Sequence, residues 1–278
     1  MYVTISLKKL LIVATSVNHR RTIFLSLNKF KMNTNFLFKM KMFFLLSMFI
    51  PFMGISQTKN IFFTQRVFPK MDKVLEFEKA LSAHAKKYHT GDVAWRVFEI
   101  QSGPDMGGYQ ITEGPTSWEA LDTRGNLGEE HNIDWNKTVA VYLTDKMSGS
   151  YSVYQDTLST VALSDFSDKI QITHVYPKIG KGNKVRDIIK NLKAAWVAEG
   201  STIAVYTTSS SGPGQYVLVT RYKQGLKEKA EGFRKPFKDT YEAVYGVGSF
   251  EAYLEGVSQF TSEVWSELLF LRKELGSK

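Results

Sequence analysis

Hydrophobic and polar residues alternate along several short stretches of this chain, a period typical of half-buried β-strands. The first stretch runs from Ile61 to Phe68 and is rich in Phe and Val. Pro69 is expected to end it, because proline cannot donate a hydrogen bond to a neighbouring strand. Apolar residues then recur three or four positions apart between Val74 and Ala85, which predicts a helix. The folded part of the chain is therefore expected to begin with a strand and a helix.

The same periodicity continues to the end of the chain and predicts eight strands and four helical segments. The predicted strands are 61–68, 93–100, 109–113, 151–162, 170–176, 202–208, 215–222 and 264–272. The predicted helical segments are 72–88, 116–146, 182–199 and 226–259. Each half of this series has the order β-α-β-β-α-β.

Short motifs in the first half recur in the second half in the same order, 107 to 111 residues later. The matched pairs are Val67-Phe-Pro-Lys70 with Val175-Tyr-Pro-Lys178, Ser102-Gly-Pro104 with Ser211-Gly-Pro213, Tyr109 with Tyr216, Tyr142-Leu143 with Tyr253-Leu254, and Val153-Tyr154 with Val264-Trp265. Order and spacing together indicate a duplication. We therefore predict two repeats, 58–165 and 168–276, joined by the polar link 164–168 and preceded by a leader, 1–56.

A β-α-β-β-α-β unit forms an antiparallel sheet with helices on one face and leaves the other face bare. Two such units in one chain can bury their bare faces against each other. This pattern resembles the dimeric α/β-barrel superfamily, on the strength of the element order and the duplication. Its branches include antibiotic-biosynthesis monooxygenase-like, NIPSNAP, EthD and stress-responsive barrel domains, haem monooxygenases and chlorite dismutases. The resemblance implies an α+β fold in which two ferredoxin-like repeats form a pseudo-dimeric barrel within one monomeric chain.

The leader is typical of a secretory signal peptide. Lys39 and Lys41 precede an apolar run over 42–53, and small residues then lead to Ser56 and Gln57. The run is shorter than the roughly 20 residues that a membrane-spanning helix needs. We expect cleavage between Ser56 and Gln57 and export to the periplasm or the medium, with no membrane span left afterwards. An uncleaved N-terminal anchor is the alternative.

A signal peptide of ordinary length would begin at Met32 or Met40, so translation is expected to start at one of these residues. Residues 1–56 carry eight Lys or Arg and no Asp or Glu. The rest of the chain has 28 basic and 27 acidic residues and is nearly neutral. A protein that binds nucleic acid needs a basic folded surface, so this class of function is set aside.

The composition removes several kinds of chemistry. The chain has no Cys, which excludes disulfides, thiolate metal sites and a cysteine nucleophile. No metal-binding or nucleophile motif of known spacing occurs, and no metal site is predicted. His84 and His89 are five positions apart on the first helix, which puts them on different faces, so both are expected to be solvated. His131 follows two Glu residues in a loop, where a role as a ligand stays open.

His174 and Arg66 are the candidate catalytic residues. His174 lies on the first strand of the second repeat, on the same face as Ile172 and Tyr176. Arg66 is its counterpart in the first repeat. If this face lines the barrel, the two side chains could meet a ligand. The alternative is a polar pair that is satisfied by neighbours or exposed at the surface.

Four aromatic residues are candidates for binding a ligand inside the barrel, and packing in the core is the alternative for each. They are Trp95, Tyr109, Tyr216 and Trp265. Aromatic walls would suit a small apolar molecule.

Two classes of function remain open. The first is an exported envelope protein that binds a small apolar ligand or a partner in its barrel. The second, implied by the resemblance alone, is a cofactor-independent or haem-linked monooxygenase or isomerase. No cofactor is predicted from the residues themselves. Haem is the cofactor that the resemblance would allow, although the helical His, Asn and Trp of haem-degrading relatives have no matching positions here.

Overall fold

The computed structural model describes residues 58–124 and 127–278. The predicted cleavage site at Ser56 and Gln57 and the predicted starts at Met32 and Met40 lie outside the described residues. No helix in the described ranges is long and apolar enough to span a membrane.

Eight strands and six α-helices form the described part of the chain. The strands are β1 (Ile61–Pro69), β2 (Trp95–Ile100), β3 (Tyr109–Thr116), β4 (Leu143–Tyr154), β5 (Lys169–Pro177), β6 (Ile203–Ser209), β7 (Tyr216–Arg221) and β8 (Thr261–Leu271). The helices are α2 (Val74–Tyr88), α3 (Trp118–Arg124), α4 (Glu129–Asp134), α5 (Gly182–Glu199), α6 (Phe237–Tyr245) and α7 (Ser249–Phe260). A π-helical turn, Trp135–Val139, continues α4.

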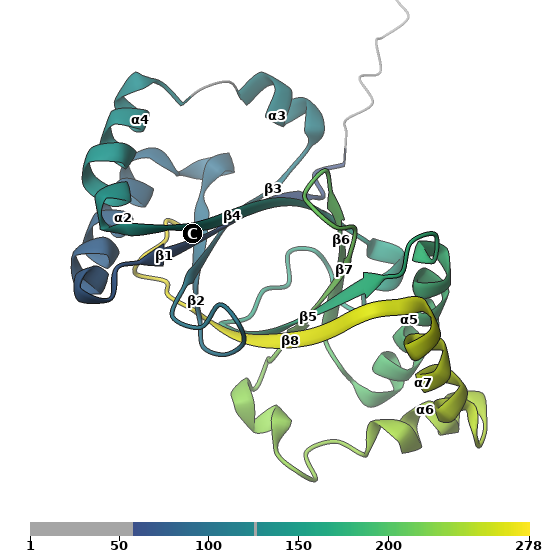
Figure 1. The fold of residues 1–278 in the computed structure, drawn as a ribbon. Helices are drawn as coiled ribbons and strands as arrows, with labels where there is room; N and C mark the ends of the chain where they lie inside the picture. The colour runs from purple at the N-terminus through teal and green to yellow at the C-terminus, as the bar shows by residue number, and fades with distance from the viewer. Residues whose placement is uncertain (1–57, 125–126) are drawn as a thin grey trace, which may run out of the picture. The chain divides into compact units, whose positions relative to one another are not determined.

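The strands close into one antiparallel barrel in the order β1-β3-β2-β8-β5-β7-β6-β4. Each half contributes a four-stranded sheet, β4-β1-β3-β2 and β8-β5-β7-β6. The edge strands join the two sheets through the pairs β2–β8 and β4–β6. The helices lie outside the barrel, with α2 and α4 against the first sheet and α5, α6 and α7 against the second (Figure 1). The predicted fold of two ferredoxin-like repeats in a pseudo-dimeric barrel is confirmed.

Alternation along the strands separates an outer core from the interior of the barrel. Outward-facing residues pack under the helices in two clusters, one around Phe77 and Leu81 of α2 and one around Ile189 and Leu192 of α5. Two smaller apolar clusters lie on inward-facing positions. A change of register by one residue would exchange these sets, so burial on both faces holds the register of each strand.

The register shows where the duplication holds and where it fails. Val67 pairs with Tyr109 across β1 and β3, as Val175 pairs with Tyr216 across β5 and β7. On the other side of these strands, however, Arg66 is opposite Ser148 and His174 is opposite Trp265. Ser148 and Trp265 are therefore the equivalent positions, and the sequence match of Val153-Tyr154 with Val264-Trp265 is a coincidence. The match of Tyr142-Leu143 with Tyr253-Leu254 also fails, because Tyr142 lies in a 3₁₀ turn and Tyr253 in α7.

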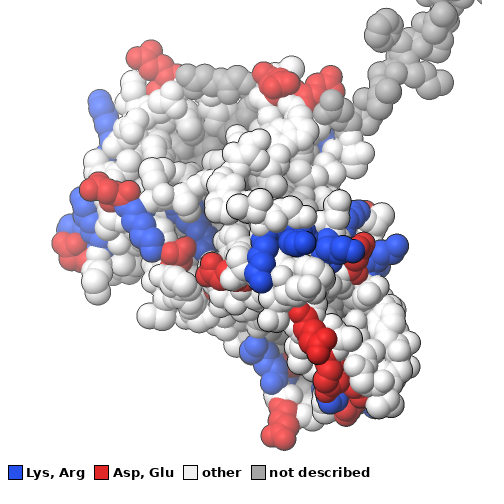
Figure 2. Space-filling model, turned by 45° about the vertical axis from the view of Figure 1, so that its right-hand side comes forward, with Lys and Arg blue, Asp and Glu red and all other residues white. Residues whose placement is uncertain are grey.

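The fourth strand was predicted over 151–162 and lies instead at Leu143–Tyr154. Its first half is mostly polar and exposed, so it lacks the apolar alternation that marks a strand. The segment after it turns back across the barrel end, where the Tyr154 hydroxyl donates to the Val161 carbonyl at 2.5 Å. Basic and acidic side chains are interspersed over the face shown in Figure 2, in keeping with the near-neutral composition of the folded part.

Candidate functional site in the barrel interior

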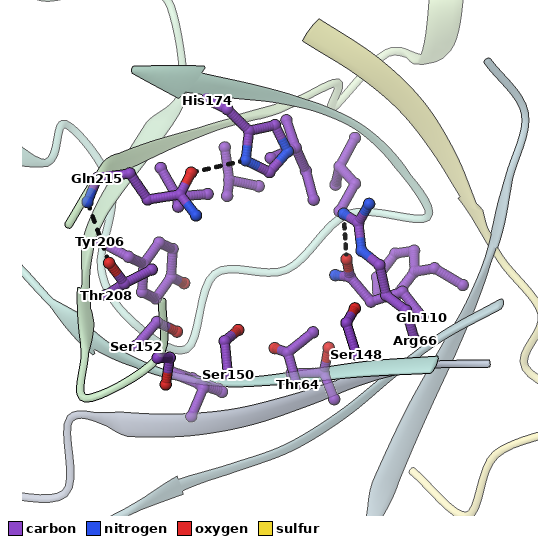
Figure 3. Close-up of a pocket in the computed structure, with 18 of the residues that line it drawn as sticks. Thr64, Arg66, Gln110, Ser148, Ser150, Ser152, His174, Tyr206, Thr208 and Gln215 are labelled. Carbon is purple, nitrogen blue, oxygen red and sulfur yellow. Dashed lines mark hydrogen bonds between the residues drawn. The ribbon is translucent and has the colours of Figure 1, made fainter. Parts of the chain in front are cut away.

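A cavity of about 360 Å³ lies inside the barrel, and both predicted residues, Arg66 and His174, line it. Its walls come from inward-facing positions of the strands and from the loops at the two barrel ends (Figure 3). Three kinds of surface make up these walls: an ionic network, a row of hydroxyl groups, and a second basic region beside an apolar patch. The volume is within the usual range for sites that bind small molecules.

The ionic network is centred on Glu267 of β8, whose side chain is completely buried. Arg66 donates from Nη1 to Glu267 Oε2 at 3.0 Å and to Asp105 Oδ2 at 2.8 Å, and from Nη2 to Glu267 Oε1. His174 Nε2 is 2.8 Å from the same Oε1 atom. Gln110 accepts a further bond from Arg66 Nη2 at 2.9 Å. One carboxylate thus connects Arg66 and His174, which come from different repeats.

This network favours the charged forms of its acidic members. Burial of Glu267 acts to raise its pKa, but the hydrogen bonds from His174 and Arg66 outweigh it and lower the pKa. The pKa of Asp105 is lowered in the same way, because Lys146 and Arg66 outweigh its burial. Burial acts to lower the pKa of Arg66, and the bonds to Glu267 and Asp105 reverse this and raise it. Arg66, Asp105 and Glu267 are therefore held in their charged forms as ion pairs.

Three side chains hold His174 in the cavity wall. Its Nδ1 lies 2.9 Å from Gln215 Oε1, and its Nε2 faces Glu267. The Trp265 ring stacks on the imidazole with centroids 4.0 Å apart and an angle of 19° between the planes. Both ring nitrogens are therefore engaged by side-chain oxygen atoms of the protein.

A row of hydroxyl groups forms the wall opposite His174. Ser148, Ser150 and Ser152 alternate along β4, and Thr64 faces the cavity from the neighbouring β1 (Figure 3). Within the described ranges, none of these four hydroxyls hydrogen-bonds to another residue. Each can donate and accept, so the wall suits a ligand with oxygen atoms along one edge.

The second basic region lies at the end of the barrel that the segment 155–168 covers. Arg221 is only 2% exposed and donates to the Ala162 carbonyl at 3.1 Å and to the Tyr206 hydroxyl at 2.9 Å. The Arg96 guanidinium lies over the Phe166 ring, 3.6 Å from its centroid. No Asp or Glu of the described part of the chain forms an ion pair with either arginine. Burial and the charge of Arg221 lower the pKa of Arg96.

A buried hydroxyl accompanies the two arginines. Ser167 lines the cavity, and its Oγ atom is buried with no hydrogen-bond partner. Unpaired buried polar atoms are rare in folded proteins and each needs a reason. Here the two arginines and Ser167 together offer donors to a negatively charged group.

Of the four predicted aromatic residues, only Trp265 lines the cavity. Trp95 and Tyr109 pack in the outer core under α2, and Tyr216 packs under α5. The prediction that these three line the interior is wrong, because each occupies an outward-facing position of its strand. The Tyr109 hydroxyl donates to Glu78 of α2 at 2.6 Å, and that of Tyr216 donates to a backbone carbonyl of α5 at 3.2 Å. The core-packing alternative describes their positions.

The repeated Ser-Gly-Pro motifs lie in the two hairpin loops at the end of the barrel near Arg66. Ser102 Oγ accepts from the Leu268 amide at 2.9 Å, and Ser211 Oγ accepts from the Tyr151 amide at 2.8 Å. Each motif thus ties its loop to a strand of the other repeat. Gly103 has φ +90° and approaches β8 so closely that an added Cβ would be 3.0 Å from Glu267 Cβ.

Similarity to known proteins is confined to three-dimensional structure. No protein-family model matches the chain, and no curated protein matches it in sequence. A proposed monooxygenase of Fusobacterium nucleatum is 14% identical with a TM-score of 0.49, and the match covers 77% of this chain and 92% of the other. An anthrone oxidase-like protein is 15% identical with a TM-score of 0.47, covering 77% and 92%. A mutant chlorite dismutase of Candidatus Nitrospira defluvii is 6% identical with a TM-score of 0.46, covering 78% and 94%.

The order and closure of the eight strands decide the fold. The chain has the dimeric α/β-barrel fold, with both halves of the barrel in one chain. Its two repeats stand where two subunits would stand in a barrel formed by two chains. A ligand in this α/β barrel would therefore meet two non-identical halves, with arginine at position 66 and histidine at the equivalent position 174.

Haem, which the resemblance allowed, does not fit the residues that line the cavity. A haem iron needs an axial ligand with an available lone pair, most often histidine. Among the described residues that line the cavity, His174 is the only histidine, and its two nitrogens face Gln215 and Glu267. No step of a reaction is therefore assigned to haem.

Proposed function

We propose that the α/β barrel binds a small organic anion with an apolar, ring-like body. The observation that carries the proposal is a pair of arginines at one end of the cavity, the partly buried Arg96 and the buried Arg221, which have no carboxylate partner among the described residues. Burying a charge without a partner costs several kcal/mol, so the pair favours an anionic occupant. This refines the expectation of an apolar ligand, because the apolar surface of the cavity is flanked by cations.

The remaining walls support the same ligand. Apolar side chains of β2, β5 and β7 face the cavity between its two ends. They are Phe98, Ile170, Ile172, Val217 and Val219. A flat apolar body could lie against them with its anionic group at Arg96, Arg221 and Ser167, and with oxygen substituents toward the hydroxyl row of β4. A carboxylate suits this end, since arginine binds carboxylates with two parallel hydrogen bonds.

Calorimetry with a panel of aromatic carboxylates tests the proposal, with the uncharged primary amide of each compound as its matched control. Carboxylates should bind one per chain and raise the melting temperature, and the amides should not. Arg96→Gln should weaken binding by about tenfold or more, the equivalent of one charge-assisted hydrogen bond. Arg186→Gln, an exposed site on α5, should leave the affinity unchanged. Equal binding of acid and amide, or full affinity in Arg96→Gln, would contradict the proposal.

A second candidate is a cofactor-independent isomerase or oxygenase, and the observation that favours it is the His174–Glu267 pair in the cavity wall. For His174 to take a proton from a ligand, one of its nitrogens must first give up its contact with Gln215 or Glu267 and turn to the ligand. Transfer of deuterium from solvent into an activated C–H group of a bound carboxylate, followed by NMR, tests this candidate. His174→Gln should abolish the exchange while binding persists. Exchange at the same rate in His174→Gln would exclude His174 as the base.

The apolar leader supports a further proposal, that the chain is exported and cleaved before Gln57. Mass spectrometry of the protein from its host, in separated cytoplasmic, periplasmic and medium fractions, tests it. An intact leader on the mature protein would contradict it.

A further inference from the structure

Three histidines converge on one point outside the barrel. His84 lies in the last turns of α2, His89 directly follows this helix, and His131 comes from α4. The Nε2 atom of His131 lies 3.2 Å from that of His84 and 3.1 Å from that of His89. The three ligand atoms all lie within 4.8 Å of one another. His84 and His89 are each 1% exposed, and His131 is partly exposed.

The sequence spacing of His84 and His89 had predicted two solvated side chains, and this prediction is wrong. The helix α2 ends at Tyr88, so His89 is the residue that leaves it, with φ −113° and ψ 70°. The change of direction turns its ring back toward the face that carries His84. The Trp95 ring then stacks on His89 with centroids 3.5 Å apart and 22° between the planes.

In two of the three rings the second nitrogen lies within hydrogen-bond distance of an oxygen atom, and in His89 the nearest carboxylate oxygen is farther away. His84 Nδ1 is 2.7 Å from Asp134 Oδ2, and His131 Nδ1 is 3.1 Å from the side-chain oxygen of Asn132. His89 Nδ1 is 3.7 Å from a carboxylate oxygen of Glu113. An oxygen acceptor beside Nδ1 favours the tautomer with its proton there and leaves a lone pair on Nε2. Ligand histidines in metal sites almost always have such oxygen partners, which orient the ring.

The two distances from His131 Nε2 to the other Nε2 atoms match those of a metal site. Zinc binds imidazole nitrogen at about 2.0–2.1 Å, which puts two nitrogens of a tetrahedral site about 3.3–3.4 Å apart. The two short contacts here are 3.2 and 3.1 Å. Without a cation, the lone pairs of three Nε2 atoms would face one another. If His131 Nε2 carried a proton instead, it could hydrogen-bond well to only one of His84 and His89. A shared cation satisfies all three rings at once.

We propose that His84, His89 and His131 bind a divalent transition metal through their three Nε2 atoms, with Zn²⁺ as the matching ion. Three protein ligands leave a fourth position for water or a small anion, and the partial exposure of His131 gives access to it. Asp134 orients the ring of His84, and Asn132 orients that of His131. The site would also link α4 to α2, so the metal would hold these two helices together.

Calorimetric titration of the metal-free full chain with Zn²⁺ tests the proposal. We expect one Zn²⁺ per chain and a higher melting temperature in its presence. Co²⁺ in place of Zn²⁺ should give the visible absorption of a tetrahedral site and quench tryptophan fluorescence, because Trp95 and Trp135 lie against the histidines. His131→Gln, at the most exposed ligand, should lower the affinity by about 100-fold or more. Asp134→Asn should lower it by about 10- to 100-fold, as expected for a residue that orients a ligand.

Two controls separate this site from adventitious binding. Glu130→Gln alters an exposed neighbour on α4 that is outside the donor set and should keep wild-type affinity. His174→Gln removes the histidine of the barrel cavity and should also bind Zn²⁺ with wild-type affinity. This control separates the test of the metal site from that of the anion site. The proposal is overturned if Zn²⁺ does not bind, if His131→Gln binds it as tightly as the wild type, or if His174→Gln alone abolishes binding. Circular dichroism of each metal-free variant shows that it is folded.

Discussion

Arg66 and His174 occupy equivalent positions in the two repeats, and both bind the same carboxylate, that of Glu267. The duplication alone would place like residues at these positions. Instead the two have diverged, and a single acid on β8 holds both of them. The symmetry of the barrel is thus broken at its most polar point, so a ligand would have one preferred orientation there.

Glu267→Gln should lower the free energy of unfolding by about 3–5 kcal/mol, since it leaves Arg66 and His174 beside a neutral group in a buried site. Urea denaturation of wild type and variant measures the difference. Glu263→Gln, at an exposed position of the same strand, is the matched control and should change it by less than about 0.5 kcal/mol. Equal effects of the two substitutions would show that the network contributes nothing to stability.

The same network makes stability depend on pH. The pKa of Glu267 is lower in the folded protein than its ordinary value of 4.5, and that of Asp105 is lower than 3.8. Groups with a lowered folded pKa stabilise the protein fully above their unfolded pKa, and this stabilisation is lost as pH falls through the folded value. The melting temperature should therefore fall as pH decreases below about 4.5, and Glu267→Gln should make the decline shallower. An unchanged slope in Glu267→Gln would show that other carboxylates cause the acid sensitivity.

The residues of this site differ in how well the sequence predicts them. Those placed by alternation along one strand are predictable, and those that depend on the pairing of two strands are not. Alternation along the first strand of each repeat placed Arg66 and His174 at equivalent positions, and the structure shows that the face they share lines the cavity. Glu267 was missed because its role depends on the register between β5 and β8, which a single strand does not reveal. Arg96 and Arg221 were missed for a related reason. Each lies on a short buried strand. In the sequence, a single Arg in such a strand looks the same whether it faces the cavity or lies exposed at the end of the barrel.

The histidine cluster shows a different limit. Periodicity treats His84 and His89 as neighbours on one continuous helix, and on that assumption they diverge. The end of α2 at Tyr88 changes the direction of one side chain, and the return of the chain at α4 adds His131. Helix ends are the least predictable features of a sequence, and this cluster depends on one.

Two glycines of the β2–β3 hairpin allow the contact with Glu267 to be tested through the backbone. Gly103 has φ +90° and Gly107 has φ +85°, so alanine at either position should cost about 1–2 kcal/mol. A Cβ at Gly107 would meet open space, whereas one at Gly103 would lie 3.0 Å from Glu267 Cβ. Gly103→Ala should therefore be the more destabilising by roughly 1–3 kcal/mol, as measured by urea denaturation. Equal losses would show that β8 moves aside at no cost.

Ser167 gives a test in which stability and binding change in opposite directions. Its buried Oγ has no hydrogen-bond partner, so Ser167→Ala should raise the free energy of unfolding of the unliganded protein by about 1 kcal/mol. Ser249 has an equally buried and unpartnered Oγ on α7, and Ser249→Ala should stabilise by a similar amount. Only Ser167 lines the cavity, so only Ser167→Ala should weaken the binding of an aromatic carboxylate. Thermal melts of both variants measure stability, and calorimetry measures carboxylate binding. Equal carboxylate affinity in the two variants would show that Ser167 is not part of the proposed anion site. The roles of Arg96 and Arg221 are tested separately by their own substitutions.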